Sequence, residues 1–572
     1  MPDLKNSGHL HRSDAGGLSQ LSIGPVAAVA GVLAAVGTIA LWWCARQGYT
    51  LYYGDAEAHL NIARRILDSR TPNGEQFGTV WLPLPHLLMI PFVLSMKAWR
   101  SGWPGAIPSC AAFVAAGTFL FAAARRVCGP SAGFVAAALF AANPNMLYLA
   151  STPMTEAIFA AALAALLWTT VWYRDRPSFA AVVVAAVASN AASLTRYEGW
   201  VLIPFVAAYF LFGTLKPDAA GPGTAEGARA RDASVTIKRK RDAFAFAALA
   251  AIGPLAWLAH NQFYFSNPLE FYNGPYSARA IYARQIAQGV HRYPGDHDWL
   301  QAAHYYFAAM NLTIGPVALG AAALGLLICL GRKYRWPVIL LALPPVFYVV
   351  SMHSGGTPVY VPELWPHTWY NTRYALAALP LAAFTGGVLI ASLPRPWRLT
   401  TGIVLIVGSV AATLATPVST TPDSAAPGSA ASASNDGRSG IGVVACWKES
   451  EVNSVGRRAW TAQAGEYLAE HYRTGGGILY PFGDMAGVLR AAGIPLEEGL
   501  HEGNHPAFDA AMARPELFLN EEWALAYDGG AVERAVLRSS KGGPHYELKR
   551  RVIVEGAPVV DIFQREPPRG PQ

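Results

Sequence analysis

Charge is scarce in this sequence of 572 residues. Asp, Glu, Lys and Arg together supply 14% of the residues, whereas hydrophobic residues supply 53%. Soluble globular domains are usually about one quarter charged. The shortage of charge therefore excludes an ordinary water-soluble protein and favours one that is largely embedded in a membrane.

Cysteine is scarcer still, and neither its number nor its spacing suggests a cross-linked or metal-binding framework. There are five cysteines, an odd number, and most lie in or beside apolar segments. No disulfide framework or zinc motif is expected from them. Four histidines, His59, His86, His353 and His367, also lack a metal-binding spacing such as HExxH, so we expect structural or substrate-contacting roles for them.

Long apolar stretches are what the sequence has in abundance. Several reach the roughly 17 to 25 residues that a helix needs to cross a bilayer with its own backbone hydrogen bonds satisfied. The prediction is an α-helical polytopic membrane protein with about eleven transmembrane helices. They are placed near residues 23–43, 106–124, 131–149, 154–172, 178–195, 199–213, 243–263, 306–330, 336–351, 374–393 and 399–415.

The net charge of +7 does not indicate a nucleic-acid partner, because the basic residues form short runs between the apolar stretches. The runs fall in alternate loops, as the positive-inside rule requires of cytoplasmic segments. They lie at residues 125–126, 174–176, 216–241, 332–335 and 395–398. This pattern predicts a multi-pass protein of the cytoplasmic (inner) membrane with a cytoplasmic N-terminal tail, residues 1–22, and an extracytoplasmic C-terminus.

This topology leaves residues 44–105 as one long outer loop. Loops longer than about 15 residues tend to be functional. Within it, residues 80–96 are hydrophobic enough to span, but they contain Pro83, Pro85 and Pro91, and a crossing here would move the next basic run to the outside. We therefore predict an interfacial or re-entrant element that lies against the outer face.

The chain changes character after the last apolar stretch of the transmembrane domain, residues 23–415. Residues 416–440 have the composition of a flexible linker, and residues 441–572 regain soluble character. Apolar runs alternate there with helical patterns, the runs at 441–445, 477–480 and 552–554 and the helical patterns at 485–492 and 522–527. A C-terminal extracytoplasmic α/β domain over residues 441–572 is predicted.

The long outer loop opens with a helical pattern that begins at Asp55. Apolar residues recur on one face and polar residues on the other, which is typical of an amphipathic helix lying on a surface. Asp55 and His59, four residues apart, fall on the side that faces the helix bundle, whereas Glu57 points away. Asp55 is therefore either the N-cap of this helix, a role in which Asp is favoured, or a functional acid.

Five short motifs follow one another at the predicted outer face. They are Gly54-Asp55-Ala56-Glu57-Ala58-His59, Trp81-Leu82-Pro83-Leu84-Pro85-His86, Ser151-Thr152-Pro153-Met154-Thr155-Glu156, Thr195-Arg196-Tyr197-Glu198-Gly199-Trp200 and Thr372-Arg373-Tyr374. Their order over most of residues 23–415 resembles the GT-C superfamily of membrane glycosyltransferases. The likeness is to bacterial relatives of protein O-mannosyltransferases and of the aminoarabinose transferase that modifies lipid A. Relatives often have two adjacent acids in the first loop, whereas here Ala56 separates Asp55 from Glu57.

The resemblance implies an enzyme that transfers a hexosyl or pentosyl group from a polyprenyl-phosphate donor, with inversion, at the outer face of the membrane. The acceptor would be a glycan, a lipid or a protein. Such a reaction needs a carboxylate that accepts the proton of the attacking hydroxyl and positive groups that stabilise the leaving phosphate. Because the donor is already a phosphate ester, no nucleotide is required.

The resemblance also assigns roles. Asp55 is the expected base, with Glu57 and Glu156 as further catalytic acids, and Arg373 and Arg196 are the expected ligands of the donor phosphate. Substrate contacts are expected from His59, His86, Tyr197, Glu198 and Tyr374. A divalent metal ion, if one takes part, would be held by Asp55 and Glu156.

Plainer roles stand beside these. Glu156 lies in the first turn of a predicted helix and can serve the helix dipole. Each arginine marks an outer helix end, where it can reach the lipid headgroups or, for Arg196, pair with Glu198 or Glu156.

A second function class is a multi-pass transporter or flippase of lipid-linked sugars. Transporters place charged or polar sites near the bilayer midplane on broken helices. Here the charged residues cluster at the outer ends of the predicted helices, which favours an interfacial enzyme. A third class is a structural or sensing protein whose work lies in residues 441–572.

Overall fold

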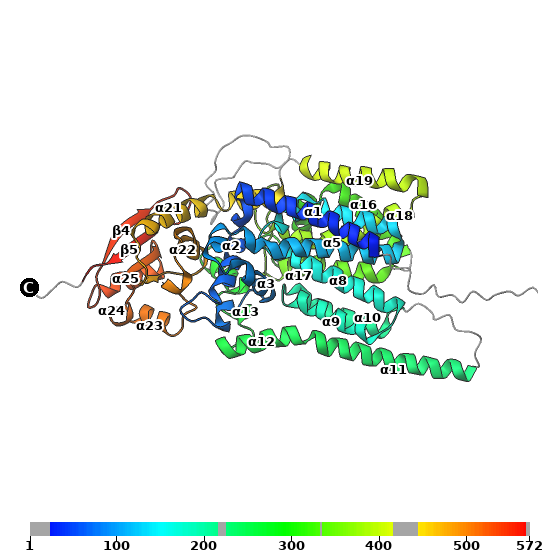
Figure 1. Ribbon diagram of the computed structural model, residues 1–572, viewed down its shortest axis with the longest axis horizontal. Helices are drawn as coiled ribbons and strands as arrows, with labels where there is room; N and C mark the ends of the chain where they lie inside the picture. The colour runs from blue at the N-terminus through cyan, green and yellow to red at the C-terminus, as the bar shows by residue number, and fades with distance from the viewer. Residues whose placement is uncertain (1–22, 215–224, 332–333, 416–443, 568–572) are drawn as a thin grey trace, which may run out of the picture.

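The computed structural model describes residues 23–214, 225–331, 334–415 and 444–567. The predicted N-terminal tail (1–22), the linker (416–440) and parts of two predicted basic loops lie outside these ranges. The described chain is a long helical bundle with a small α/β domain at one end (Figure 1).

Long apolar helices run side by side along the bundle (Figure 1). Within the described ranges, seven helical segments are long and apolar enough to cross a membrane, or nine if each of two bent helix pairs counts as one span. The long segments are built from α1 (Ile23–Gln47), α5 (Ile107–Cys128), α8 (Glu156–Asp175), α11 (Ala225–Ala250) with α12 (Ile252–Phe265), α17 (Arg335–His353), α18 (Leu379–Ser392) and α19 (Arg395–Ala415).

Two predicted spans are broken helices. The pair α6 (Pro130–Ala141) and α7 (Pro144–Ala150) bends by 67°, and the pair α15 (Trp299–Ile314) and α16 (Pro316–Gly331) bends by 112°. A proline begins the second helix of each pair, where its missing N–H and fixed φ favour a new helix start. Two further predicted spans, α9 (Phe179–Ser193) and α10 (Glu198–Phe212), have 15 residues each. Every predicted stretch thus coincides with a helix or a helix pair, but four of the eleven are not long unbroken spans.

The predicted long outer loop folds into short helices at the end of the bundle that carries the C-terminal domain. They are α2 (Gly54–Arg65), α3 (Leu84–Val93) and α4 (Met96–Ser101), with 3-10 turns η1 (Tyr49–Leu51), η2 (Gly74–Phe77) and η3 (Trp103–Ala106). At 1.5 Å per residue, the ten residues of α3 extend about 15 Å, roughly half of the hydrocarbon core. The proline-rich segment is thus too short to cross a bilayer as a helix, as the prediction of an interfacial element requires.

The C-terminal domain is a mixed five-stranded sheet with flanking helices. The strand order is β2-β1-β3-β5-β4, with β1 parallel to β2 and β3, and β5 antiparallel to β3 and β4. The strands are β1 (Ile478–Leu479), β2 (Gly499–Leu500), β3 (Trp523–Tyr527), β4 (Tyr546–Val552) and β5 (Val560–Arg565). The helices are α20 (Ala445–Val452), α21 (Val455–His471), α22 (Ala486–Ala492), α23 (Ala507–Ala513), α24 (Pro515–Phe518) and α25 (Ala531–Ser539).

One local prediction in this domain is wrong. The segment 522–527 has a helical pattern in the sequence, but it forms the central strand β3. Its first four residues, Trp523 to Ala526, are all buried. When a strand is covered on both faces, its packing outweighs the helix propensity of Ala and Leu. The alternation of apolar and polar residues that identifies a strand in a sequence is then absent.

The outer-loop helices and the C-terminal domain share one hydrophobic core. Leu60 of α2 and Trp99 of α4 belong to the same buried cluster as Trp460, Leu468 and Tyr480. The predicted surface-lying helix is therefore covered on both sides, and its polar residues Glu57, Asn61 and Arg65 are buried rather than exposed. The sequence pattern identified the face of α2 that packs against the bundle. The other face is covered by the C-terminal domain, whose residues lie about 400 positions later in the chain.

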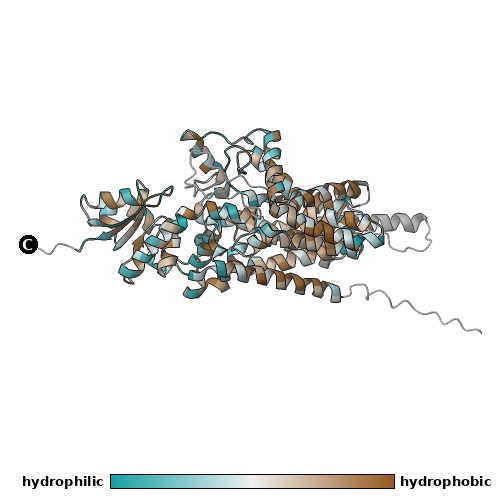
Figure 2. Cartoon of the chain, turned by 90° about the horizontal axis from the view of Figure 1, so that it is seen from above, coloured by the Kyte–Doolittle hydropathy of each residue, from teal (hydrophilic) through white to brown (hydrophobic). Residues whose placement is uncertain are grey.

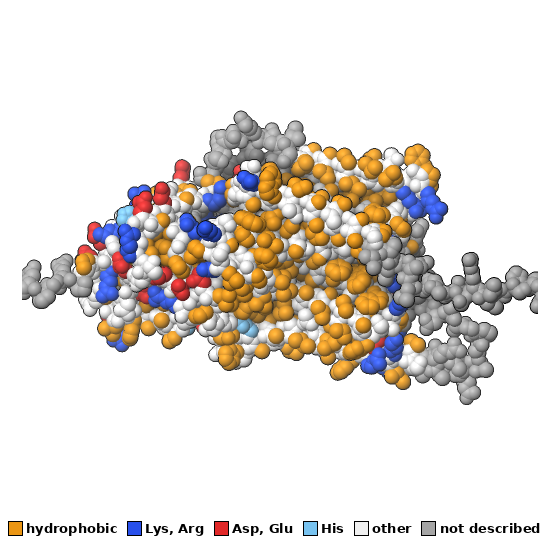
Figure 3. Space-filling view, in the orientation of Figure 1, with side chains coloured by type: hydrophobic (Ala, Val, Ile, Leu, Met, Phe, Trp, Pro, Cys, Tyr) orange, Lys and Arg blue, Asp and Glu red, His pale blue; other side chains and the backbone are white. Residues whose placement is uncertain are grey.

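Polarity divides the molecule along its long axis. Figure 2 shows hydrophobic helices over the bundle and a more hydrophilic C-terminal domain. In Figure 3, acidic and basic side chains mix at the end that carries this domain, while basic side chains gather at the opposite end of the bundle. This distribution has the form that the positive-inside rule gives to a membrane protein.

Three further short helices connect the longer ones. They are α13 (Glu270–Asn273), α14 (Ala278–Ala287) and the 3-10 helix η4 (Thr372–Ala378), which leads directly into α18. The helix η4 carries Arg373 and Tyr374 at its first turn.

Candidate active site

The buried Arg373, the part-buried Arg196 and four carboxylates meet at the end of the bundle that carries the C-terminal domain. Arg373 forms ion pairs with Asp55 of α2, with Glu156 of α8 (Nε to Oε1, 3.3 Å) and with Glu449 of α20 (Nη1 to Oε1, 3.4 Å). Arg196, just before α10, forms ion pairs with Glu156 and Glu198. We call these two arginines and four carboxylates, together with Tyr348 and Tyr374, the arginine–carboxylate cluster.

Asp55 lies in the first turn of α2 and is the most accessible acid of the cluster. The helix begins at Gly54 after an extended Tyr53, and no side chain caps it, so the alternative reading of Asp55 as the N-cap is wrong. The Asp55 side chain is 40% exposed, whereas those of Arg373, Glu156 and Glu449 are 7% exposed or less. A carboxylate held by a buried arginine yet open to solvent can meet a substrate.

Glu156 is the first residue of α8. The predicted span began near residue 154, and the helix begins two residues later. One carboxylate oxygen, Oε1, contacts both arginines, at 3.2 Å from Arg196 Nη1 and 3.3 Å from Arg373 Nε. The other oxygen, Oε2, is buried and has no hydrogen-bond partner. Since a buried polar atom without a partner is costly, this oxygen is suited to a substrate group.

Arg196 is fixed by several partners at once. Its Nε lies 2.6 Å from Glu198 Oε1, its Nη1 donates to Thr155 Oγ1 (2.7 Å), and its Nη2 donates to the Tyr348 hydroxyl. Tyr348 in turn donates to Glu198 Oε1 (2.6 Å). Helix α10, which follows Arg196, packs closely against α9. It can do so because it carries Gly199, where a Cβ would overlap the backbone at position 192.

Tyr374 separates the two arginines. The guanidinium carbon lies 5.1 Å from the ring centroid for Arg196 and 4.9 Å for Arg373. A second tyrosine, Tyr53, lies 5.0 Å from Arg373. All three distances are in the range of cation–π attraction, so the rings hold two like charges near one another at reduced cost.

Glu449 is the member that the sequence did not reveal. It is 2% exposed and accepts hydrogen bonds from the backbone N–H groups of Asn371 (2.9 Å) and Thr372 (2.8 Å) and from the Thr372 hydroxyl. Burial raises the pKa of Glu449, while Arg373 and the Thr372 groups act in the opposite direction. This carboxylate holds the start of η4, and therefore Arg373, from a segment that the sequence assigned to the separate outer domain.

The cluster is tightly closed. A cavity of about 20 Å³ lies among Glu156, Arg196, Glu198, Tyr348 and Arg373, which is room for about one water molecule. A phosphate group that binds the arginines must therefore displace a carboxylate. Asp55 is the carboxylate on the accessible side.

Other predicted site residues lie elsewhere. Glu57 is buried against the C-terminal domain, where it pairs with Arg457 and with Arg490 (2.7 Å). Tyr197 donates to the Val80 carbonyl (2.8 Å) and stacks on Phe271. The structure thus places Glu57 and Tyr197 outside the arginine–carboxylate cluster.

The histidines form no common group. His59 Nδ1 lies 2.8 Å from His86 Nε2, and both side chains are buried. Burial lowers the pKa of His59 to about 4. His353 instead stacks on Trp299, and His367 lies against the Pro362 carbonyl.

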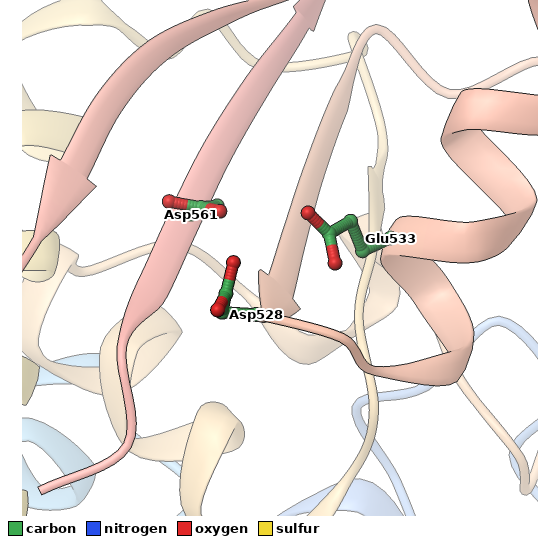
Figure 4. Close-up of side chains that lie close together, drawn as sticks. All are labelled: Asp528, Glu533 and Asp561. Atoms are coloured by element: carbon green, nitrogen blue, oxygen red, sulfur yellow. The ribbon is translucent and has the colours of Figure 1, made fainter.

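Two groups of acidic side chains are candidate metal sites: Asp55 with Glu156, and a group in the C-terminal domain. In each group an arginine already pairs with the acids. Arg373 already bridges Asp55 and Glu156, so a cation between them would have to displace the guanidinium. Among the described residues, one group of three potential ligands lies close together, namely Asp528, Glu533 and Asp561 of the C-terminal domain (Figure 4). Arg551 pairs there with Asp561 (2.7 Å) and Asp528 (2.9 Å), so a guanidinium already occupies two of the three carboxylates.

Comparisons with known proteins agree with this architecture. A family model described as dolichyl-phosphate-mannose-protein mannosyltransferase matches residues 83–219. The crystal structure of ArnT from Cupriavidus metallidurans bound to undecaprenyl phosphate is similar with a TM-score of 0.55 at 13% identity, over 95% of this chain and 98% of that chain. A comparison with curated proteins finds no match.

An archaeal structure is more distant. The Archaeoglobus fulgidus oligosaccharyltransferase tethered with an acceptor peptide has a TM-score of 0.46 at 11% identity, over 89% of this chain and 70% of that chain. The family match and the likeness to ArnT confirm the predicted resemblance to the GT-C superfamily and the predicted fold class.

Proposed function

We propose that this chain, which has the fold of a GT-C membrane glycosyltransferase, transfers a sugar from a polyprenyl-phosphate donor to an acceptor at the outer face of the cytoplasmic membrane. The observation that carries the proposal is the ion pair between buried Arg373 and accessible Asp55. It joins a phosphate ligand and a base, the two groups that the reaction needs, in one contact.

The pair suggests how donor binding prepares catalysis. When the donor phosphate binds Arg373, with Arg196 as a second ligand, it competes with the Asp55 carboxylate for the same guanidinium. A guanidinium binds phosphate oxygens through two parallel hydrogen bonds. Asp55 is then released and accepts the proton of the acceptor hydroxyl, while the arginines stabilise the negative charge that develops on the leaving phosphate.

The arrangement is suited to inversion. A single displacement needs one base beside the attacking hydroxyl, with the leaving group on the opposite side of the sugar carbon. Asp55 supplies one accessible carboxylate, whereas Glu156, Glu198 and Glu449 are buried. Glu156 supports the site through its contacts with both arginines and through its unpaired oxygen.

The membrane orientation is part of the proposal. Basic side chains gather at the end of the bundle opposite to the C-terminal domain, which supports a cytoplasmic location for that end and an outer location for the arginine–carboxylate cluster. An outer site meets no cytoplasmic nucleotide sugars, and a lipid-linked donor needs none. The acceptor is a glycan, a lipid or a protein.

The test is transfer from a radiolabelled polyprenyl-phosphate sugar by the full-length protein, with Asp55→Asn as the variant. The neutral amide keeps the shape but is no base, so we expect transfer to fall by about 10² to 10⁴-fold. Asp509→Asn is the matched control, because that side chain is 62% exposed and pairs with His505 on the C-terminal domain.

Two outcomes would contradict the proposal. Full activity of folded Asp55→Asn protein would remove the base assignment. Movement of labelled donor between leaflets of proteoliposomes, with no product in the presence of acceptors, would favour the transporter class instead.

A further inference from the structure

A second cavity lies beside the first turn of α2 and is lined by Glu57 but not by Asp55. It has a volume of about 260 Å³ and shares no lining residue with the arginine–carboxylate cluster. Its walls come from the outer end of α1 at Ala45 and Gly48, from η1 and α2, and from α21 and α22 of the C-terminal domain. We call it the arginine pocket.

The pocket carries excess positive charge. Arg457, Arg458 and Arg490 line it together with a single carboxylate, Glu57. Glu57 pairs with Arg457 and Arg490, and Asp484 and Asp55 lie near enough to act on the charge of Arg457, whereas Arg458 has no such partner among the described residues. Burial lowers the pKa of Arg490 to about 10, which shows how poorly this charge is solvated. A further anion in the pocket would therefore be stabilised.

Arg458 is held in place with its outer nitrogens unused. Its guanidinium stacks at 3.9 Å over the Tyr52 ring, and its Nε donates to Ser454 Oγ (3.0 Å). Within the described part of the chain, Arg458 pairs with no carboxylate. Stacking and a single hydrogen bond thus orient a guanidinium whose two terminal N–H₂ groups stay available.

Two buried hydroxyls add independent evidence for a ligand. Thr50 is 3% exposed and Thr461 is 6% exposed, both line the pocket, and neither hydroxyl has a hydrogen-bond partner. Buried polar groups normally have a hydrogen-bond partner, and leaving one without a partner is unfavourable. Two such groups in the wall of a positively charged cavity indicate an oxygen-rich ligand that accepts and donates hydrogen bonds.

We propose that the arginine pocket binds the phosphoryl headgroup of a membrane lipid. The lipid origin follows from the position of the pocket at the outer end of α1, a candidate spanning helix. Trp42 and Trp43 in the last turns of this helix are 58% and 50% exposed, and tryptophan at a helix end is typical of the level of the lipid headgroups. The bound lipid would bridge α1 and the C-terminal domain. This inference does not depend on the proposed transferase activity.

The test uses the full-length protein in a neutral detergent and three probes: dioleoyl phosphatidic acid, dioleoylglycerol and inorganic phosphate. Binding is measured by native mass spectrometry and by the thermal shift. We expect phosphatidic acid to bind, dioleoylglycerol to bind at least about tenfold more weakly, and inorganic phosphate to give no shift at the same concentration. Equal binding of dioleoylglycerol would overturn the phosphoryl assignment, and equal binding of inorganic phosphate would overturn the lipid assignment.

Two variants locate the site. Arg458→Gln is expected to weaken phosphatidic acid binding by about tenfold, the effect of losing one charged hydrogen-bonding group. Arg473→Gln is the matched control, since that exposed arginine lies just beyond α21 and contacts backbone carbonyls. Unchanged affinity of Arg458→Gln would overturn the proposal.

Thr461→Val separates ligand binding from structural support. Valine has nearly the shape of threonine and removes a hydroxyl that has no protein partner. The variant should therefore be at least as heat-stable as the natural protein without lipid, yet bind phosphatidic acid several-fold more weakly. Full affinity in this variant would show that the hydroxyl does not face the ligand and would count against the site.

Discussion

Arg373 and Asp55 form an ion pair although 318 positions separate them in the chain. Arg373 comes from η4, directly before α18, and Asp55 from the first turn of α2. The contact therefore joins early and late parts of the membrane domain at the end that carries the C-terminal domain. A charge pair between one buried and one accessible side chain can open when a stronger anion arrives, and we regard it as the resting state of the site.

The geometry of Arg373 predicts that lysine cannot replace it. The guanidinium reaches Asp55, Glu156 and Glu449 with three different nitrogens, whereas an ammonium is a single point of charge. We expect Arg373→Lys to lower kcat/KM for the lipid-linked donor by about 10² to 10³-fold, equivalent to roughly 3 to 4 kcal/mol. Exposed Arg279 provides the control, and Arg279→Lys should leave the rate unchanged. Comparable rates in the two variants would contradict the role of Arg373.

Glu449 is predicted to position Arg373. In Glu449→Gln an N–H₂ group replaces one acceptor and faces the donors of Asn371 and Thr372, so one of these contacts is lost. We expect the free energy of unfolding to fall by about 1 to 3 kcal/mol and the KM for the donor to rise. Glu451→Gln, on the same helix, breaks only a part-exposed pair with Lys448 and should cost under about 1 kcal/mol. A stability loss with an unchanged donor KM would restrict Glu449 to a structural role.

The buried pair of Glu57 with Arg457 and Arg490 should secure the C-terminal domain to the outer-loop helices. Glu57→Gln removes the carboxylate that pairs with both Arg457 and Arg490, so we expect a loss of about 3 to 5 kcal/mol and faster proteolysis between α20 and α21. Glu547→Gln breaks an exposed pair with Lys549 and should have little effect. If limited proteolysis treats both variants alike, the pair does not hold the domains together.

The His59 and His86 pair predicts loss of stability in acid. Burial lowers the pKa of His59 from 6.5 to about 4, so the unfolded chain binds its proton more tightly than the folded protein does. The contribution of His59 to the free energy of unfolding is complete above pH 6.5. It falls by about 3 kcal/mol in total as the pH drops toward 4. Thermal unfolding at pH 7.5 and pH 5 should therefore show a smaller difference in His59→Gln than in the natural protein. The same substitution at exposed His471 should preserve the full difference.

Periodicity and composition were enough to predict the helices. Each of the eleven predicted apolar stretches forms a helix or a helix pair. A bilayer requires long apolar segments with internal hydrogen bonds, and such segments can be recognised from the order of apolar residues alone. The breaks were harder to predict, since Pro144 and Pro316 interrupt stretches whose hydropathy continues on both sides. The central strand β3 was missed because burial on both faces removes the alternation that identifies a strand.

The candidate site was predicted in part. Asp55, Glu156, Arg196, Glu198, Arg373 and Tyr374 were all selected from short motifs, and the structure brings them together. Glu449 and Tyr348 were not selected. Glu449 lies in a polar helix of ordinary composition, and Tyr348 is one aromatic residue among many in a spanning helix, so neither has a local signal.

The sequence by itself therefore determined the membrane character, the positions of the helices and most of the charged residues at one end of the bundle. These features depend on local hydropathy and on motifs of a few residues, which a linear pattern can carry. Only the tertiary structure decided that Glu57 is buried under the C-terminal domain, that Glu449 enters the arginine–carboxylate cluster, and that Arg457, Arg458 and Arg490 face a cavity beside α1. These are contacts between segments hundreds of residues apart, and the free energy of burying charge sets them only once the helices have packed.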